Sequence, residues 1–194
     1  MALPCQSSEA STEEDQVVTA KRAVFLDRDG VLVVPEFRGG RSFAPTGLED
    51  YRFYADAPQA LSRLKMVGFT LVVVTNQPDV GNGLLSQAVA DEMHERLRNA
   101  MPVDMVKACF HAQTANCDCR KPKPGMLMEA ARELGIDLKQ SYMVGDRASD
   151  IEAGEAAGCR TVFIDLEYSE RRPAAPTFTV RSVAEAADRI LNPT

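Results

Sequence analysis

Short, β-branched apolar runs alternate along this chain with segments of helical periodicity. Strands are predicted at residues 23–26, 70–74, 105–110, 141–144, 161–164 and 177–180. Helices are predicted at residues 57–67, 86–100, 124–134, 147–157 and 182–191. This order is typical of βαβ units, in which helices connect parallel strands. The sequence therefore predicts an α/β fold with a mostly parallel sheet and helices on both of its faces.

The length and the composition predict one globular domain. The chain has 194 residues, of which 45% are apolar and 26% are charged. These fractions are ordinary for a globular protein, and the length suits one domain better than two. Residues 1–20 are polar and acidic and lack periodicity, which predicts a mobile tail. We therefore expect a single domain over residues 21–194.

The formal net charge is −6, because 28 acidic residues outnumber 22 basic ones. This balance disfavours broad binding to nucleic acids or to anionic membranes. No apolar stretch approaches the length of a membrane span and no secretory signal is visible, so the cytoplasm is the expected compartment. An anionic ligand would need a local positive site.

Four clusters of polar side chains follow predicted strands, and the third of them begins with the run of cysteines before Arg120. The clusters are Asp27 with Asp29, Thr75, Arg120 with Lys121, and Asp146 with Asp150. Each cluster alone is compatible with an ordinary turn. In an open α/β sheet, however, ligands bind beyond the carboxyl ends of the strands. The coincidence of four clusters at this edge predicts a functional site.

Two carboxylates two residues apart can divide the work of phosphoryl transfer. One of Asp27 and Asp29 can attack a phosphorus atom while the other exchanges a proton with the leaving group. A carboxylate approaches a dianionic phosphate only with the help of a cation, and Mg²⁺ prefers oxygen ligands. Asp146 and Asp27 are the natural carboxylate pair for Mg²⁺. Lys121 and Thr75 can stabilise the transferring oxygens.

Four ordered segments resemble the motifs of the haloacid-dehalogenase (HAD) superfamily of phosphatases, in its capless branch. The segments are DRDGVL (27–32), VVVTNQ (72–77), CRKPKPGM (119–126) and MVGDRASD (143–150). The resemblance implies a three-layer, Rossmann-like HAD fold. It also implies that Asp27 is the nucleophile and Asp29 the general acid and base. Thr75 and Lys121 would stabilise the phosphoryl group.

The same resemblance implies a set of ligand contacts. Mg²⁺ would be bound by Asp27, by the backbone carbonyl of Asp29 and by Asp146. Asp150 would hydrogen-bond to that group. The implied substrate contacts are Arg28, Asn76, Gln77, Arg120 and Arg147.

The cysteines predict a second metal site. Three cysteines and a histidine form the pattern C-x-H-x5-C-x-C, made by Cys109, His111, Cys117 and Cys119. Three thiolates and one imidazole are a complete tetrahedral set for Zn²⁺, so the zinc would be structural. It would stabilise the loop and fix Arg120 and Lys121, which follow the last ligand. Cys5 lies in the tail, and Cys159 is expected to be a small core residue.

The segment between Asp27 and Thr75 is too short for a cap domain once its predicted helix is placed. We therefore expect a site that is open to solvent. Residues 35–48 contain Arg38 and Arg41 beside two glycines. They form either a flexible basic flap that contacts the substrate or a solvated loop. The solvated loop is favoured, so neither arginine is assigned to the site.

Two substrates compete within the capless branch. The spacing of the zinc cluster and the run GDRASDI (145–151) resemble enzymes that act on histidinol phosphate. The run KPKPGML (121–127) resembles enzymes that act on heptose 1,7-bisphosphate, and we favour this sugar phosphate, with loss of its 7-phosphate. A catalytically idle phosphosugar-binding protein is the remote alternative. The expected partner is therefore a small phosphorylated metabolite, and the expected state is a monomer.

Three other positions are expected to carry no function. His94 is expected on the solvated face of its helix. Arg171 and Arg172 are expected to face solvent from a loop.

Overall fold

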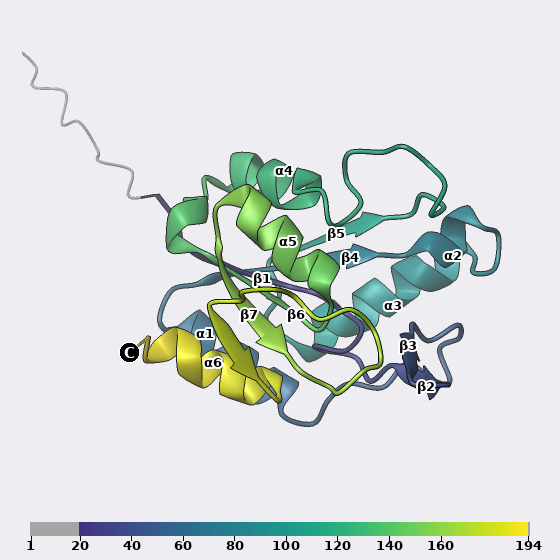
Figure 1. Cartoon of the computed structure of the whole chain (residues 1–194), viewed down its shortest axis with the longest axis horizontal. Helices are drawn as coiled ribbons and strands as arrows, with labels where there is room; N and C mark the ends of the chain where they lie inside the picture. Colours follow the sequence, from purple (N-terminus) through teal and green to yellow (C-terminus); the bar gives the residue numbers. More distant parts are fainter. Residues whose placement is uncertain (1–19, 194) are drawn as a thin grey trace, which may run out of the picture.

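Six parallel strands form the centre of the computed structural model, which describes residues 20–193 (Figure 1). Their order across the sheet is β5-β4-β1-β6-β7-β8. The strands are β1 (Ala23–Leu26), β4 (Thr70–Asn76), β5 (Met105–Cys109), β6 (Tyr142–Gly145), β7 (Arg160–Ile164) and β8 (Phe178–Val180). The chain runs outward from β1 through β4 to β5, and then returns to place β6 on the other side of β1. Ligands of open α/β sheets bind at such a switch point.

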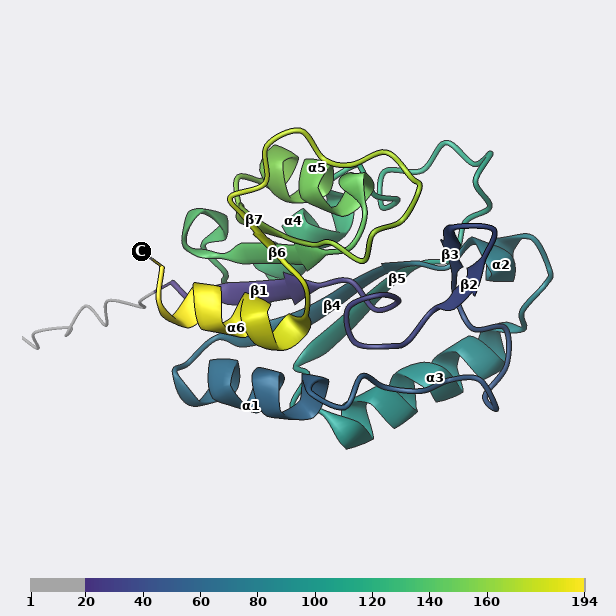
Figure 2. The same cartoon turned by 60° about the horizontal axis from the view of Figure 1, so that its bottom comes forward.

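Helices cover both faces of this sheet, as predicted (Figure 2). One face carries α1 (Ala57–Met66), α3 (Gln87–Ala100) and α6 (Val183–Leu191), and the other carries α4 (Gly125–Leu134) and α5 (Ala148–Ala157). Side chains of β1 alternate between the two cores, with Val24 and Leu26 in the first and Ala23 and Phe25 in the second. No helix within residues 20–193 is long and apolar enough to cross a membrane.

Most helices begin and end close to the predicted positions, at capping residues or at a terminating glycine. The Ser86 hydroxyl accepts a hydrogen bond from the backbone N–H of Val89 and caps α3. Gly135 ends α4 in the left-handed conformation, with a φ of 68°. Asp56 precedes α1 as expected, but its side chain makes no capping hydrogen bond. The expected tail lies outside the described residues, apart from Ala20, and so does Cys5.

A two-stranded antiparallel hairpin stands in the segment that was expected to be a solvated loop. Its strands are β2 (Glu36–Arg38) and β3 (Arg41–Phe43). Gly39 and Gly40 form the turn with φ values of 58° and 75°, which suit the two positive φ angles of a type I′ turn. The strands have only three residues each, so alternation of apolar and polar residues gave a weak signal. Two short helices, α2 (Pro78–Gly81) and η1 (Leu138–Gln140), were also not predicted.

Candidate active site

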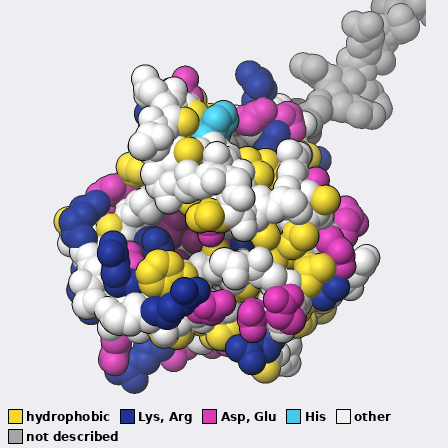
Figure 3. Space-filling model, turned by 90° about the vertical axis from the view of Figure 1, so that its right-hand side faces the viewer, with side chains coloured by type: hydrophobic (Ala, Val, Ile, Leu, Met, Phe, Trp, Pro, Cys, Tyr) yellow, Lys and Arg dark blue, Asp and Glu magenta, His cyan; other side chains and the backbone are white. Residues whose placement is uncertain are grey.

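Residues of all four polar clusters meet in a cavity of about 420 Å³ beyond the carboxyl ends of the strands, although Asp146 does not line it. Figure 3 shows a hollow on this side of the molecule, with acidic side chains inside it and basic ones along its rim. The predicted site residues that line it are Asp27, Asp29, Thr75, Asn76, Arg120, Lys121, Arg147 and Asp150. It is also lined by residues without an expected role, namely Arg41, Ser42, Phe43, Ala44, Pro78, Asp79, Gln113, Ser149 and Glu170.

The Lys121 ammonium lies between two carboxylates at the bottom of the cavity. Its Nζ is 2.8 Å from Oδ1 of Asp27 and 2.7 Å from Oδ1 of Asp150. It also donates a hydrogen bond to the Val74 carbonyl oxygen at 2.7 Å. Burial alone would lower the pKa of Lys121, but the charges of Asp150 and Asp27 outweigh burial and hold the pKa above its usual value. Lys121 therefore stays positively charged beside Asp27.

Three buried carboxylates form a group that fits a divalent cation. Oxygens of Asp27, Asp146 and Asp150 lie within 4.8 Å of one another. Burial, followed by the charges of Asp27 and Asp150, raises the pKa of Asp146 well above its usual value. Burial also raises the pKa of Asp150 to about 6. A cation among these oxygens would remove the repulsion between them.

One oxygen of this group has no protein partner. Oδ1 of Asp146 is buried without any hydrogen bond among the described residues. Buried polar atoms are almost always paired, so an orphaned carboxylate oxygen points to a missing ligand. Hard oxygen donors of this kind suit Mg²⁺. The residues present therefore fit the predicted magnesium site. Asp150 lies among its carboxylates, whereas the sequence indicated only a hydrogen bond to them.

Arg28 and Gln77 hold Asp29 in place and do not line the cavity, which corrects their expected role as substrate contacts. The Arg28 guanidinium is fully buried and donates from Nε and Nη2 to the two oxygens of Asp29, at 3.0 and 2.9 Å. Gln77 Nε2 donates to Oδ2 of Asp29 and to Oγ1 of Thr75, both at 2.8 Å. The two side chains thus orient Asp29, the predicted general acid and base, without lining the cavity themselves.

His94 is buried, so the expectation of a solvated histidine was wrong. Its Nε2 lies 3.4 Å from Nη1 of Arg28, and its ring stacks on Phe110. Burial and the charge of Arg28 lower the pKa of His94 to about 4, which keeps the ring neutral at pH 7. A neutral imidazole can accept the hydrogen bond that the guanidinium donates. Because α3 also buries Met93 and Leu97, helical spacing could have placed His94 on the buried face.

The cysteine cluster has the dimensions of a tetrahedral zinc site. Sγ of Cys109 lies 3.7 Å from Sγ of Cys117, and Nδ1 of His111 lies 3.5 Å from Sγ of Cys109 and 3.3 Å from Sγ of Cys119. Zn–S bonds of about 2.3 Å and Zn–N bonds of about 2.0 Å require S···S distances of about 3.8 Å and S···N distances of about 3.5 Å. Burial and the neighbouring thiols raise the pKa of Cys119 to about 12, so a thiolate at Cys119 would need a cation beside it.

Three arginines surround the mouth of the cavity. Arg120 follows the cysteine cluster and donates to the His111 carbonyl oxygen at 3.3 Å. Arg147 donates to the Ser42 carbonyl oxygen of β3 at 2.6 Å. Arg41 reaches the cavity from β3, although a solvated loop was the favoured expectation for its segment and Arg41 was therefore not assigned to the site. These cations make the rim suitable for an anionic ligand.

A parallel sheet with paired aspartates beyond β1 and a buried lysine before α4 defines a hydrolase of the HAD type. Residues 118–186 match the HAD-hydrolase-like family model. A D-glycero-beta-D-manno-heptose-1,7-bisphosphate 7-phosphatase of Pseudomonas aeruginosa is 34% identical over 162 residues, which are 81% of this chain and 88% of that protein. The chain therefore belongs to the HAD family of phosphatases.

Other relatives agree with this assignment. The enzyme of the same name from Vibrio cholerae is 37% identical over 187 residues, which are 89% of this chain and 97% of that protein. The crystal structure of D,D-heptose 1,7-bisphosphate phosphatase from B. bronchiseptica, complexed with magnesium and phosphate, has a TM-score of 0.77 at 26% identity. That comparison covers 89% of this chain and 99% of the other.

Proposed function

We propose that this protein hydrolyses a small sugar phosphate, with D-glycero-D-manno-heptose 1,7-bisphosphate as substrate and the 7-phosphate as the group removed. The observation that carries the proposal is the contact between Asp27 and Lys121 at the bottom of an open cavity with a cationic rim. Such a site offers a carboxylate nucleophile and a fixed positive charge to a phosphate ester. The names of the relatives support the choice of sugar.

In the first step, the Asp27 carboxylate attacks phosphorus and the bond to the sugar oxygen breaks. Asp29, which carries a proton when the substrate binds, gives this proton to that oxygen, and the sugar leaves with a free hydroxyl group in place of the phosphate ester. In the second step, Asp29 takes a proton from water, whose oxygen attacks phosphorus and frees Asp27 as its carboxylate. Lys121 and the Thr75 hydroxyl contact the transferring oxygens throughout. Asp27 and Asp146 would hold Mg²⁺, which would supply positive charge to offset the repulsion between carboxylate and phosphate.

Asp29 is already oriented for this exchange of protons. Arg28 and Gln77 donate three hydrogen bonds to its carboxylate, which fix the side chain beside Thr75 at the cavity. A fixed side chain loses less entropy when it meets the substrate. The roles implied by resemblance stay proposals, among them the backbone carbonyl of Asp29 as a Mg²⁺ ligand and the substrate contacts of Asn76, Arg120 and Arg147. Asn76 lines the cavity and exchanges hydrogen bonds with the backbone of Lys121.

The cationic rim suits a substrate with a second phosphate, and Arg41 offers the simplest test. Arg41→Ala should lower kcat/KM for the bisphosphate about tenfold, mainly through KM, because a charged hydrogen bond contributes about 1.5–3 kcal/mol. The effect should be smaller on the 7-monophosphate of the same sugar. Steady-state phosphate release with both substrates measures the difference.

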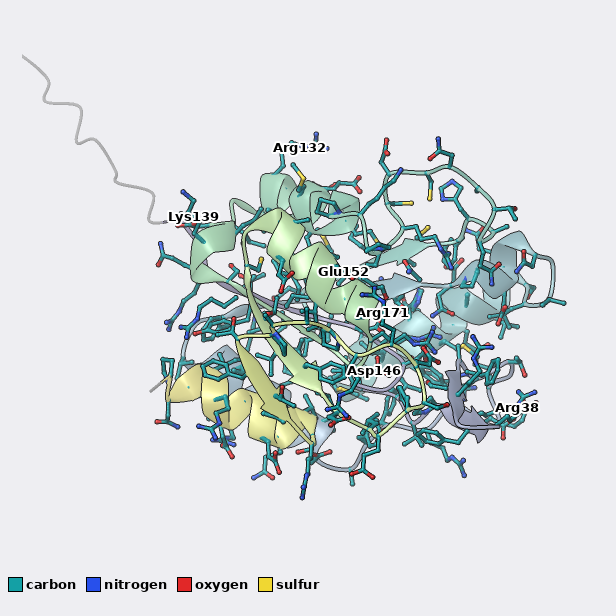
Figure 4. All side chains as sticks on the ribbon, in the orientation of Figure 1. Arg38, Arg132, Lys139, Asp146, Glu152 and Arg171 are labelled. Atoms are coloured by element: carbon teal, nitrogen blue, oxygen red, sulfur yellow. The ribbon has the colours of Figure 1, made fainter. Side chains whose placement is uncertain are left out.

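Arg38 provides the matched control for this variant. It lies directly across the hairpin from Arg41, but it pairs with Glu36 and points outward at the edge of the molecule (Figure 4). Arg38→Ala should leave both substrates unaffected. An equal loss of activity on the bisphosphate and on the monophosphate in Arg41→Ala would argue against a role in binding the second phosphate.

We also propose that the cysteine cluster binds structural zinc. Cys117→Ser should lower zinc content and melting temperature together, because the loop has almost no core of its own. Activity should fall as well, since the loop carries Arg120 to the rim. Cys159→Ser is the control, because Cys159 is buried outside the cluster, so this variant should keep its zinc. An unchanged zinc content in Cys117→Ser would refute the ligand set.

Histidinol phosphate is the second candidate substrate. The cavity also carries the carboxylates of Asp79 and Glu170, which could pair with the amine of such a substrate. A phosphate-release screen of heptose bisphosphate, histidinol phosphate and common sugar phosphates, ranked by kcat/KM, decides between them. A clear preference for histidinol phosphate would overturn our choice. The cytoplasmic location, the monomeric state and the lack of nucleic-acid or membrane partners stay predictions.

A further inference from the structure

The loop after β7 reaches back over the metal-binding carboxylates. From this loop, the Tyr168 hydroxyl donates a hydrogen bond of 2.7 Å to Oδ2 of Asp146. Asp146 lies beneath the same loop in Figure 4. Gly30, which has a φ of 92°, lies against the same oxygen, since a Cβ at this position would be 2.0 Å from Oδ2. One oxygen of Asp146 is therefore enclosed by two separate segments of the chain.

The other oxygen of Asp146 has no hydrogen-bond partner of this kind within the described part of the chain. Oδ1 is buried and has no hydrogen bond among residues 20–193. A carboxylate oxygen of Asp146 lies within 4.8 Å of ligand atoms on Asp27 and Asp150. The two oxygens thus have different surroundings, one with a fixed donor and one without a partner. A rotation of the carboxylate group would exchange them and would break the bond to Tyr168.

Tyr168 is itself held in position by the hairpin. Its ring packs against Phe37 of β2, with 5.6 Å between the ring centroids. The next residue, Ser169, donates from its backbone N–H and from its hydroxyl to the Gly40 carbonyl oxygen, at 3.1 and 2.9 Å. The loop is therefore attached to the hairpin turn. This attachment and the packing of the ring together fix the position of the Tyr168 hydroxyl.

We propose that Tyr168 is a positioning residue that fixes the Asp146 carboxylate so that Oδ1 faces the bound cation. The inference depends on one part of the proposed function only, namely the magnesium site. Hydrogen-bond partners of metal ligands typically contribute about 10- to 100-fold to metal affinity, because they fix the ligand before the metal arrives. Tyr168 touches neither substrate nor metal in this account, and it acts through Asp146.

Tyr168→Phe tests this proposal, because it removes the hydroxyl and keeps the ring on Phe37. Calorimetric titration with Mg²⁺ in the absence of substrate should give a dissociation constant raised about tenfold. The Mg²⁺ concentration for half-maximal activity should rise by the same factor, while kcat at saturating Mg²⁺ should return to the wild-type value. Tyr142→Phe is the control. It removes a hydroxyl that accepts from Arg160, away from the site, and should leave Mg²⁺ affinity unchanged.

An unchanged Mg²⁺ dissociation constant in Tyr168→Phe would overturn the proposal, provided that the variant melts like the wild type without metal. So would a kcat that stays low at saturating Mg²⁺ without any loss of affinity, because Tyr168 would then act on the substrate. The titration contains no sugar phosphate, so a wrong choice of substrate leaves this test intact. A wild-type protein that binds no Mg²⁺ would contradict the magnesium site itself.

Discussion

Asp27→Asn should abolish phosphate release and leave the fold and the zinc content unchanged. The amide keeps the size of the side chain but cannot attack phosphorus, and loss of a nucleophile costs on the order of 10⁴- to 10⁶-fold in kcat. Lys121 keeps its contact with Asp150 in this variant, so no buried cation is left unpaired. Phosphate release at saturating Mg²⁺, a melting curve and a zinc assay together check the expectation.

The same variant separates an enzyme from a protein that only binds phosphosugars. Retained phosphate release in Asp27→Asn would refute the aspartyl-phosphate route. A wild-type protein that binds heptose bisphosphate tightly and never releases phosphate would support the idle alternative.

Lys121→Met should have the second largest effect, on both activity and stability. Removal of one fixed donor from an anionic transition state costs about 10²- to 10³-fold in kcat. The substitution also leaves Asp27 and Asp150 buried without their cation. Loss of one partner of a buried ion pair typically destabilises a protein by about 3–5 kcal/mol. Methionine fills most of the space, so the loss of charge dominates.

The stability of Lys121→Met should depend on pH, and the direction follows from Asp150. The pKa of Asp150 is already raised to about 6 by burial, and loss of the lysine raises it further. A carboxyl group with a raised pKa in the folded state stabilises the fold when protonated and loses that contribution as the pH rises through this pKa. The destabilisation should therefore be larger at about pH 8 than at about pH 5. Melting curves in chelator at both values check this, and an equal loss at both would contradict it.

The place of Asp27 at the ligand edge of the sheet was predictable because it directly follows a regular element. Asp27 comes one residue after β1, and the strand direction alone carries it to the ligand edge of the sheet. The direction in which the side chain of an adjacent loop residue points is harder to predict from the sequence. Arg28 is adjacent to Asp27, yet it turns away from the cavity and binds Asp29, because the loop geometry decides where it points.

Local sequence patterns do not predict contacts between segments that lie far apart in the chain. Tyr168 meets Asp146 and Phe37 only because the loop after β7 folds back over the hairpin. Neither segment shows the periodicity of a long helix or strand, so propensity gives no information about their pairing. Arg41 was not assigned to the site because its short segment also lacks such periodicity. The two glycines beside it are nevertheless a usual signal for a hairpin turn.

The stereochemical course at phosphorus tests the central claim most directly. The substrate is heptose bisphosphate whose 7-phosphate is made chiral by one sulfur atom and two oxygen isotopes. After hydrolysis in water of the third oxygen isotope, the configuration of the released thiophosphate is read by NMR. Transfer to Asp27 and then to water involves two in-line displacements, each of which inverts phosphorus. We therefore expect overall retention of configuration. Inversion would mean a single direct attack by water and would contradict Asp27 as the nucleophile.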